Sequence, residues 1–502
     1  MARSQIKTGA ILSYVAVFLN IAISFFYTPW MIRQIGVSDY GLYSLVMSFI
    51  SYFILDLGLT QTVQRFIAKY RAEGDLEAVQ NLIGLTAKIF LIIDIIIFLI
   101  LFVCYFFLAQ IFAGLTPEEV EKLKVLYCIA GTFSVLSFMF KPLGGTILAF
   151  ELFTATQWIG MLNKVGAVVL ICVALLLGAD VYALVLINGA MALMASILKY
   201  AVFRKKTGLH INWKYYDRGK VKEVFSFSMW AFGNGLAQRM RLTLIPTVLG
   251  ILSNSIEISV FSLGMTLEAM VFTLSAAING LFLPRVSQLT VKGDIQAVEG
   301  LMLRVGRLQM YLITLIFSGF VIFGKQFLSL WVEPQFKNTY YVLLCLIFTN
   351  LVTLTQRIAD DYIYVENRIK DSSIRLFSSS LVGLFISAVL APKLGAIGCG
   401  IGTGAGLLMY TISINVFYSK GLKLNIKQFF CNCHLKILPL LLVLSVIVYF
   451  AVAHIDLSSW IRLLLAIFVY TVLFGLVSYF FLFNEDEKSL SRSMIHFGNR
   501  HE

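Results

Sequence analysis

Long runs of apolar residues alternate with short polar connectors along nearly the whole chain. About 20 consecutive apolar residues cross a bilayer as a helix, and the runs reach this length repeatedly. The pattern predicts about 14 spans, at 9–32, 39–63, 82–109, 123–147, 155–178, 181–203, 224–249, 257–282, 305–328, 340–364, 372–391, 396–418, 437–454 and 460–483. We therefore expect an all-α integral membrane protein with 14 transmembrane helices.

The composition agrees with this expectation, and the basic residues add an orientation. Hydrophobic residues make up 59% of the 502 residues and charged residues only 13%, against roughly a quarter in soluble proteins. Lys and Arg collect in the polar segments 65–71, 204–222 and 420–436, whereas the connector 252–256 has neither. The positive-inside bias then places both termini in the cytoplasm. The formal net charge of +13 follows from this topology and does not indicate a nucleic-acid partner.

A short polar phrase occurs twice in the chain. "RAEGDLEAVQN" begins at Arg71 and "TVKGDIQAVEG" begins at Thr290, so Asp294 repeats Asp75 at an offset of 219. Neighbouring positions align at nearly the same offset: Pro29, Ser44 and Arg65 with Pro246, Ser262 and Arg285. Six predicted spans separate the two copies, and an even number gives both halves the same sense through the membrane. We predict a parallel repeat, with a chance match as the alternative.

The repeat predicts the domain organisation. An N-lobe at 1–203 (spans 1–6) is followed by a cytoplasmic linker at 204–223, a C-lobe at 224–418 (spans 7–12), two further spans at 419–483 and a cytoplasmic tail at 484–502. Pro29 and Pro246 occupy matching places in the first helix of each lobe. Proline kinks a helix, and matched interruptions in two halves point to the substrate path of a transporter. We predict both as helix-bending positions, although membrane helices also tolerate proline without such a role.

The chain resembles a known family in its first two spans and in its overall plan. The phrases "FYTPWMIRQIGVSDYGLYSL" and "DLGLTQTVQRFIAKY", with 14 spans in a 6+6+2 pattern and short loops, resemble bacterial polysaccharide-repeat flippases. These are the O-antigen and capsule branch of the multidrug/oligosaccharidyl-lipid/polysaccharide exporter superfamily. The resemblance implies export of undecaprenyl-diphosphate-linked oligosaccharides across the bacterial inner membrane by alternating access of two lobes. Many relatives carry Asp near the position of Arg241, so an ion-coupling role for that helix does not carry over.

Cationic and polar side chains inside the spans are the candidate substrate contacts. A charge at the bilayer centre costs roughly 2.5–3.5 kcal/mol, so intramembrane charges point to function. A lipid diphosphate requires fixed positive charge, and a guanidinium binds phosphate oxygens as a fork. We expect the substrate path to include Arg241, Lys164, Arg239, Asn234, Gln238, Asn20 and Gln157.

Charged residues in other spans are candidates for ion coupling or gating. They are Asp94, Asp56, Glu268, Arg357, Asp360 and Asp361. Asp94 lies near mid-membrane with no obvious local partner, which suits a proton or sodium site. Arg357 and Asp361 are four residues apart on one predicted helix, so a local ion pair is the alternative to a gate. Lys88 and Lys141 are expected to extend towards the cytoplasmic interface.

Three other functions stay open at this point. A multidrug exporter with cationic substrates would be expected to have an acidic cavity, which the Lys and Arg inside these spans disfavour. A lipid II flippase shares the chemistry and the span number but would be expected to carry more cations in span 1. A membrane enzyme of polysaccharide synthesis would require a larger extramembrane loop than connectors of about 20 residues provide. We therefore expect a transporter rather than an enzyme.

Neither a cofactor nor a metal is expected. No nucleotide-binding G-x-x-x-x-G-K-[ST] motif occurs, and "CNCH" at Cys431–His434 is at most half of a metal site. The expected partners are the lipid-linked oligosaccharide and membrane lipid, with a polysaccharide polymerase or ligase as a further candidate. The protein is expected to be a monomer.

Overall fold

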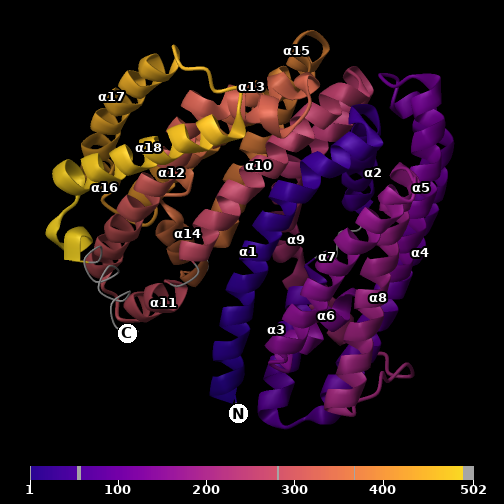
Figure 1. Ribbon diagram of the computed structural model, residues 1–502. Coiled ribbons are helices and arrows are strands. Elements are labelled where there is room, and N and C mark those ends of the chain that lie inside the picture. Colours follow the sequence, from indigo (N-terminus) through magenta and orange to yellow (C-terminus); the bar gives the residue numbers. More distant parts are fainter. Residues whose placement is uncertain (1, 54–57, 280–281, 367, 490–502) are drawn as a thin grey trace, which may run out of the picture. The chain divides into compact units, whose positions relative to one another are not determined.

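The computed structural model describes residues 2–53, 58–279, 282–366 and 368–489, except for the side chains at 2–14, 61, 227, 229–235, 237–242 and 284. Every regular element in these ranges is a helix, and none of these residues forms a strand (Figure 1). Within them, ten helical segments are long and apolar enough to cross a membrane. The number is eleven if 334–353 and 357–365, bent by 61°, count as one span. The predicted all-α membrane class is thereby confirmed, and the number 14 stays a prediction.

The described residues up to 207 form eight helices. They are α1 (Ala2–Ile35), α2 (Val37–Phe53), α3 (Leu59–Glu73), α4 (Leu76–Ile111), α5 (Pro117–Phe138), α6 (Lys141–Ala149), α7 (Phe153–Leu176) and α8 (Val181–Thr207). The apolar run 123–147, expected as one helix, is divided between α5 and α6. Pro142 lies in the first turn of α6, where it cannot donate to the carbonyl four residues back, so the helix is interrupted there.

The second part repeats this order of continuous and interrupted helices. It contains α9 (Arg218–Leu252), α10 (Ser255–Asn279), α11 (Leu283–Val291), α12 (Ile295–Trp331), η1 (Pro334–Asn338), α13 (Thr339–Thr353), α14 (Arg357–Val365) and α15 (Ile369–Lys420). The interrupted pairs α2/α3 and α5/α6 correspond in order to α10/α11 and α13/α14. The chain continues through α16 (Ile426–Asn432), α17 (His434–Val452), α18 (Trp460–Val477) and the π-helix η2 (Ser478–Leu482).

The 52-residue α15 consists of two arms that meet at Gly395, whose φ of 53° and ψ of −132° are not helical. The runs 372–391 and 396–418, expected as separate spans, correspond to these arms. The arms pack closely because their interface is made of glycine: a β-carbon on Gly383 would lie 2.9 Å from the Gly402 carbonyl oxygen and 3.2 Å from the Gly406 α-carbon. Glu257 accepts a hydrogen bond from the Ala396 amide at 2.6 Å and so caps the second arm.

The repeated Gly-Asp phrase forms the same turn in both places. Gly74 and Gly293 adopt left-handed φ values of 77° and 68°, which glycine adopts without a steric penalty. Asp75 and Asp294 then cap α4 and α12 with nearly equal φ/ψ values of −88°/82° and −87°/80°. Asp75 accepts from the Ala78 amide at 2.8 Å and Asp294 from the Ala297 amide at 2.9 Å. The repeat in sequence is therefore a repeat of local structure.

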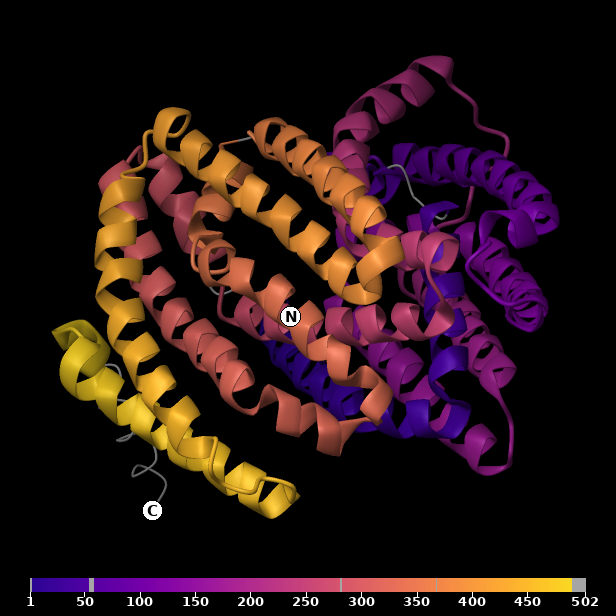
Figure 2. The same cartoon turned by 90° about the horizontal axis from the view of Figure 1, so that it is seen from above.

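The contacts divide the chain into two compact units. Unit 1 comprises 1–266 and 369–407, and unit 2 comprises 267–368 and 408–502. The division passes through α10 and α15. The lobes predicted at 1–203 and 224–418 rest on the sequence repeat and stay a prediction. Within unit 2, α12 lies against α13, α17 and α18 (Figure 2).

A buried ion pair joins the end of the chain to α12 in unit 2. The Arg307 guanidinium donates to both carboxylate oxygens of Glu487 at 2.6 and 2.9 Å, and the two side chains are only 7% and 4% exposed. It also donates to the Asn432 and Leu482 carbonyls, both at 2.8 Å, and to the Tyr311 hydroxyl at 2.9 Å. Glu487 and the described residues just after η2 are thereby part of the packed structure.

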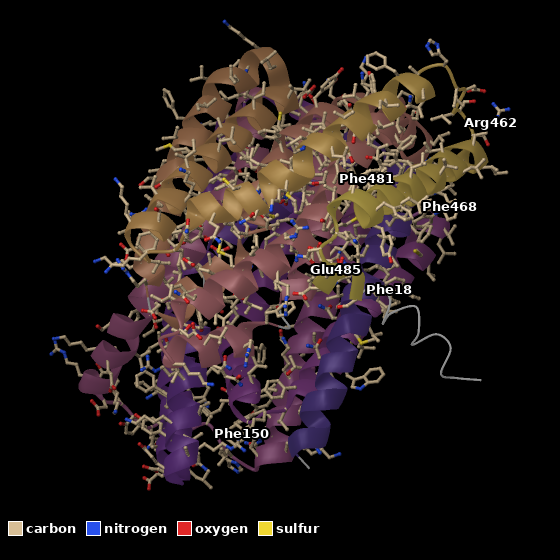
Figure 3. The ribbon with its side chains drawn as sticks, turned by 90° about the vertical axis from the view of Figure 1, so that its left-hand side faces the viewer. Phe18, Phe150, Arg462, Phe468, Phe481 and Glu485 are labelled. Carbon is tan, nitrogen blue, oxygen red and sulfur yellow. The ribbon has the colours of Figure 1, made fainter. Side chains whose placement is uncertain are left out.

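Large apolar side chains cover much of the surface of each unit, as expected of lipid-facing helices. Phe18 on α1 is 73% exposed, and Phe468 on α18 is 66% exposed (Figure 3). The exposed pair of Asp456 and Arg462 joins the connector before α18 to its first turn. Apolar surface of this extent agrees with a protein that crosses the membrane several times.

Candidate functional site

One candidate residue of unit 2, Glu268, belongs to a buried polar pair that crosses between helices, and a second such pair lies nearby on the same helix. Glu268 of α10 is 6% exposed and accepts a hydrogen bond from the Asn350 amide of α13 at 3.0 Å. About two helix turns further along α10, Ser275 and Gln309 exchange two hydrogen bonds, each 2.9 Å long. The sequence marked Glu268 by its charge but not Asn350 or Gln309, because each is a neutral amide in a largely apolar span.

Arg357 forms its ion pair with Asp360, three residues on, whereas Asp361 was the partner considered as the alternative to a gate. The Arg357 guanidinium donates to Asp360 Oδ2 at 3.2 Å, and the Tyr418 hydroxyl donates to Asp360 Oδ1 at 2.7 Å. The guanidinium also lies 5.3 Å from the centre of the Phe272 ring. Residues three apart are neighbours on a helix, and the additional bond from Tyr418 fixes Asp360 as the partner. Asp361 lies half-buried beside this pair.

A reciprocal amide pair lies next to this cluster and was not predicted. Gln356 donates to the Asn415 oxygen at 2.7 Å, and Asn415 donates to the Gln356 oxygen at 3.0 Å. Together with the bond between Asp360 and Tyr418, it joins the start of α14 to the second arm of α15. Unit 2 thus contains a connected set of polar contacts in which three of the candidate charges take part or lie alongside.

The candidates in unit 1 are more dispersed. Asn20 on α1 and Lys164 on α7 are exposed, and Gln157, two turns before Lys164, is half-buried. α1 and α7 pack against each other, so these side chains belong to neighbouring helices. Asp94 on α4 is half-buried, and its Oδ1 has no hydrogen-bond partner among the described residues.

Five candidates cannot be placed. The side chains of Arg241, Arg239, Asn234 and Gln238 lie outside the described part of α9, and Asp56 lies outside the described residues. The helical backbone of α9 is continuous through 234–241. These residues therefore stay predictions.

Both prolines predicted to bend helices lie inside helices of unit 1 and are buried. Pro246 has no amide hydrogen, so the Leu242 carbonyl four residues back loses its helical donor. Tyr52 of α2 donates its hydroxyl to the Thr243 carbonyl, and the same hydroxyl lies 2.9 Å from the Thr247 hydroxyl. In a second contact, the buried hydroxyls of Ser228 on α9 and Thr62 on α3 lie 2.8 Å apart. α9 is thus held to α2 and α3 by hydroxyl groups at two levels.

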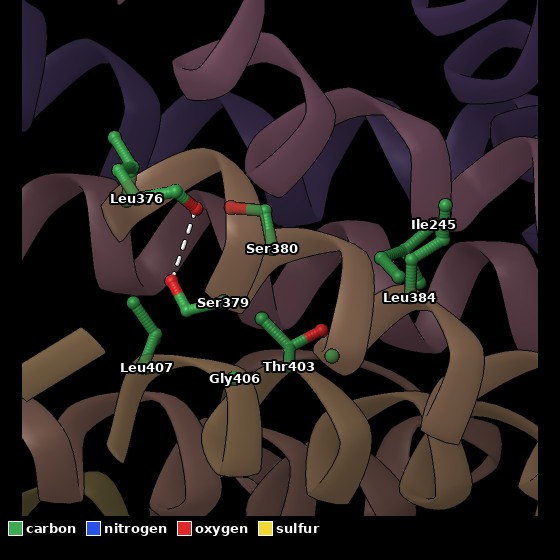
Figure 4. Close-up of a pocket in the computed structure, with 9 residues that line it drawn as sticks. Ile245, Leu376, Ser379, Ser380, Leu384, Thr403, Gly406 and Leu407 are labelled. Atoms are coloured by element: carbon green, nitrogen blue, oxygen red, sulfur yellow. Dashed lines mark hydrogen bonds between the residues drawn. The ribbon is translucent and has the colours of Figure 1, made fainter. Parts of the chain in front are cut away.

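Neither of two cavities in unit 1 has the properties of a path for a large glycolipid. A volume of about 10 Å³, room for about one water molecule, lies between Ile245 and the arms of α15, beside Ser379 and Thr403 (Figure 4). A second cavity of about 260 Å³ lies at the turn between α3 and α4, beside Asp75 and Tyr215.

At this second cavity the linker before α9 is bound to α3 and α4. The Lys220 ammonium donates to the Tyr70 hydroxyl at 2.9 Å and to Glu223 at 3.0 Å, and these contacts raise the pKa of Lys220. Asn212 donates to Asn81 at 2.6 Å. Lys88, expected to extend to the interface, donates to the Tyr215 carbonyl at 3.0 Å.

The Cys431–His434 segment is part of the packing of unit 2. His434 is 5% exposed, and its Nε2 lies 3.1 Å from the Leu351 carbonyl oxygen. The ring also lies against Phe429 and Phe430. The described residues contain no group of three or more His, Cys, Asp or Glu side chains arranged to hold a metal ion.

Comparisons with known proteins agree with the helical architecture. The "Uncharacterized membrane protein EpsK" of Bacillus subtilis is 21% identical over 330 residues, which are 64% of each chain, so the match spans less than two thirds of that relative. The "Probable low-salt glycan biosynthesis flippase Agl15" of Haloferax volcanii is 19% identical over 417 residues, or 82% of each chain. The solved structure "Lipid II flippase MurJ, inward closed conformation" superposes with a TM-score of 0.71 at 11% identity, over 95% of this chain and 98% of that one.

A family match extends over more than half of the sequence. Residues 6–302 match the family described as "Polysaccharide biosynthesis protein". This range contains the two phrases in the first two spans that resemble polysaccharide flippases, and the fold agrees with that resemblance. The chain therefore belongs to the polysaccharide biosynthesis protein family.

Proposed function

We propose that the protein is a flippase that exports undecaprenyl-diphosphate-linked oligosaccharide repeat units across the bacterial cytoplasmic membrane, for assembly of a cell-surface polysaccharide. The family match over residues 6–302 is the observation that carries this proposal. Two of the similar proteins are themselves named as flippases, one for glycan biosynthesis and one for lipid II.

The proposed architecture is two parallel six-helix lobes and two further helices, 14 spans in all, with both termini in the cytoplasm. The recurring order of interrupted helices and the equal caps of Asp75 and Asp294 support the parallel repeat. Alternating access then consists of a change in the relation between the lobes, with the substrate between them.

The diphosphate is proposed to bind the cations of α7 and α9. Lys164 is exposed, so its ammonium is available to an anionic headgroup. Arg241 is assigned from its sequence position, with Arg239, Asn234 and Gln238 on the same helix. An inside-negative potential of about 100 mV favours outward movement of two negative charges by about 4.6 kcal/mol. Asp94, whose Oδ1 has no partner in the described part of the chain, is the proposed coupling group.

Reconstitution tests the proposal directly. The purified protein would be placed in proteoliposomes with a fluorescent lipid-diphosphate oligosaccharide, and a membrane-impermeant quencher would report which leaflet holds it. Protein-dependent movement between leaflets is the expected result, and movement should be faster with a potential of the proposed sign. Movement of lipid II alone would point to the peptidoglycan precursor, and movement of a cationic dye alone to drug export.

A further inference from the structure

The N-terminal ends of α2 and α10 cross at backbone contact in unit 1. A β-carbon on Gly41 would lie 2.1 Å from the Ser255 carbonyl oxygen and 2.7 Å from the Ser259 hydroxyl. The fully buried Ser259 donates that hydroxyl to the Val37 carbonyl at 2.5 Å. Only glycine at 41 permits an approach this close.

The residues in this crossing are counterparts of one another in the sequence repeat. The offset of 218 that aligns Ser44 with Ser262 also aligns Val37 with Ser255 and Gly41 with Ser259. Gly41 of α2 contacts Ser255 of α10. The two counterparts make the reverse contact, since Ser259 of α10 contacts Val37 of α2. Reciprocal contacts of this kind arise where a two-fold axis passes through an interface. The axis that relates the repeats therefore passes through the crossing of α2 and α10.

A carboxylate from α5 fastens the same crossing. Glu119 Oε1 accepts hydrogen bonds from the Ser38 hydroxyl at 2.7 Å and from the Ser255 hydroxyl at 2.5 Å, and the two hydroxyl oxygens are 3.0 Å apart. The capping box with Thr116 holds Glu119 in place. Lys122 of α5 binds Asp39 of α2 at 2.9 Å. Glu119 of α5 thus joins α2, in the first half of the repeat, to α10, in the second half.

The surroundings of the crossing are closely packed. A β-carbon on Gly114, before α5, would lie 2.3 Å from the Ser253 carbonyl oxygen. A β-carbon on Gly250, at the end of α9, would lie 3.0 Å from the side chains of Leu45 and Phe112. The connectors after α4 and α9 therefore close in against α2 at this end of unit 1.

We infer that the crossing of α2 and α10 is a gate at the releasing end of the transport path, held closed by Ser38, Glu119 and Ser255. The inference rests on the proposed flippase function. A substrate that moves between two repeat-related lobes travels along their axis, so α2 and α10 must separate where they cross it. Hydroxyl-to-carboxylate bonds suit such a contact, because water can replace each partner when the helices part. The predicted topology places this gate on the outer face.

A disulfide across the gate tests the inference. Ser38→Cys and Ser255→Cys would be combined after replacement of the seven native cysteines, which are all unpaired. The two hydroxyl oxygens are 3.0 Å apart, so the side chains at 38 and 255 are in contact, as a disulfide between them requires. Oxidation should lower export roughly tenfold or more, and a reductant should restore it. Each single variant should export at the same rate before and after oxidation, whatever that rate is, because it cannot form the disulfide. Normal export by the oxidised double variant would overturn the gate.

A distance measurement separates failure of the gate from failure of the proposed function. Spin labels at two exposed positions, Gln34 just before α2 and Ile256 in the first turn of α10, report the separation of these helix ends without any substrate. Two distance populations are expected, of which only the shorter remains after the disulfide forms. If the parent protein moves no lipid-linked oligosaccharide and still shows both populations, the proposed function fails and the gate stands. One unchanging population would refute the gate, whatever the protein transports.

Discussion

Lys88 of α4 and Arg307 of α12 occupy corresponding positions in the two halves, and each donates to the backbone of the segment that follows the last long helix of its half. Lys88 reaches the Tyr215 carbonyl at 3.0 Å, and Arg307 reaches the Asn432 carbonyl at 2.8 Å. The offset between them is the one that relates Asp75 to Asp294. The two halves therefore agree in how they hold their connectors, as well as in the order of their helices.

The matched caps should contribute equally to stability. Replacing Asp75 or Asp294 with Ala removes the acceptor for the Ala78 or Ala297 amide, at a cost of about 1 kcal/mol each. Asn at either position should retain most of the stability, because it also accepts this bond. Thermal unfolding in detergent would compare these variants with Glu77→Ala, an exposed neighbour. Equal melting temperatures for the Asp→Ala variants and Glu77→Ala would contradict the prediction.

Two ion pairs between α12 and the end of the chain should differ widely in their contributions. Glu487→Ala leaves the Arg307 guanidinium buried without its counterion, which should cost about 3–5 kcal/mol. Asp486→Ala breaks the pair with Arg304, whose side chains are 60% and 65% exposed, and should cost at most about 1 kcal/mol. Urea unfolding of the two variants measures the difference. Similar midpoints would show that the buried pair is not stabilising.

The cations proposed to bind diphosphate should affect export and leave the fold intact. Arg241→Ala and Lys164→Ala should each reduce export strongly at normal protein levels. Arg241→Lys should retain part of the activity, since an ammonium keeps the charge but not the two-pronged geometry. The assay is leaflet transfer of the fluorescent substrate, with membrane content measured in parallel. Full export by both Ala variants would place the diphosphate elsewhere.

The start of α9 should weaken in acid. The backbone amides of Lys220 and Gly219 donate to Asp217 and hold the pKa of its carboxyl below the ordinary value of 3.8. A carboxyl with a lowered pKa stabilises the folded state above its ordinary pKa, and this stabilisation disappears as the pH falls through the folded value. Hydrogen exchange of these two amides should therefore gain protection as the pH rises through this range, beyond the intrinsic pH effect. Asp217→Asn should remove that dependence, and an unchanged profile would exclude this cap as its cause.

A side chain at Gly41 should hold the proposed gate apart. Gly41→Val places carbon atoms where the Ser255 carbonyl lies, so a cysteine at position 255 should react faster with a membrane-impermeant thiol reagent. Gly160→Val is the matched control, because a β-carbon at Gly160 meets nothing within 4 Å. Equal labelling rates in the two backgrounds would mean that α2 and α10 tolerate the insertion without separating.

Local signals predicted much of this molecule from sequence. The all-helical class follows from apolar runs of spanning length, and the Gly-Asp phrase encodes a turn whose geometry depends on adjacent residues alone. The partner of Arg357 could not be predicted in this way. Asp360 and Asp361 are both within reach on one helix, and the choice between them is fixed by Tyr418, 58 residues further along the chain.

The pairs inside unit 2 were hidden for the same reason. Asn350 and Gln309 are neutral amides in largely apolar spans, and their partners Glu268 and Ser275 come from another helix. The contact of Gly41 with Ser255 could not be predicted from the sequence either. A glycine in a membrane helix has many uses, and its role here depends on a helix from the other half of the repeat.

The contact of Arg307 with Glu487 also sets an order of events during biosynthesis. The 180 residues between them take about 10–40 s to synthesise at about 5–20 residues per second. Throughout that interval α12 is present with its guanidinium, while the carboxylate that neutralises it has not been made. The nascent protein therefore carries this guanidinium without its carboxylate partner until residue 487 has been made. A chain truncated before Glu487 keeps the guanidinium unpaired with that carboxylate, and membrane quality-control proteases should degrade it faster than a chain that contains Glu487.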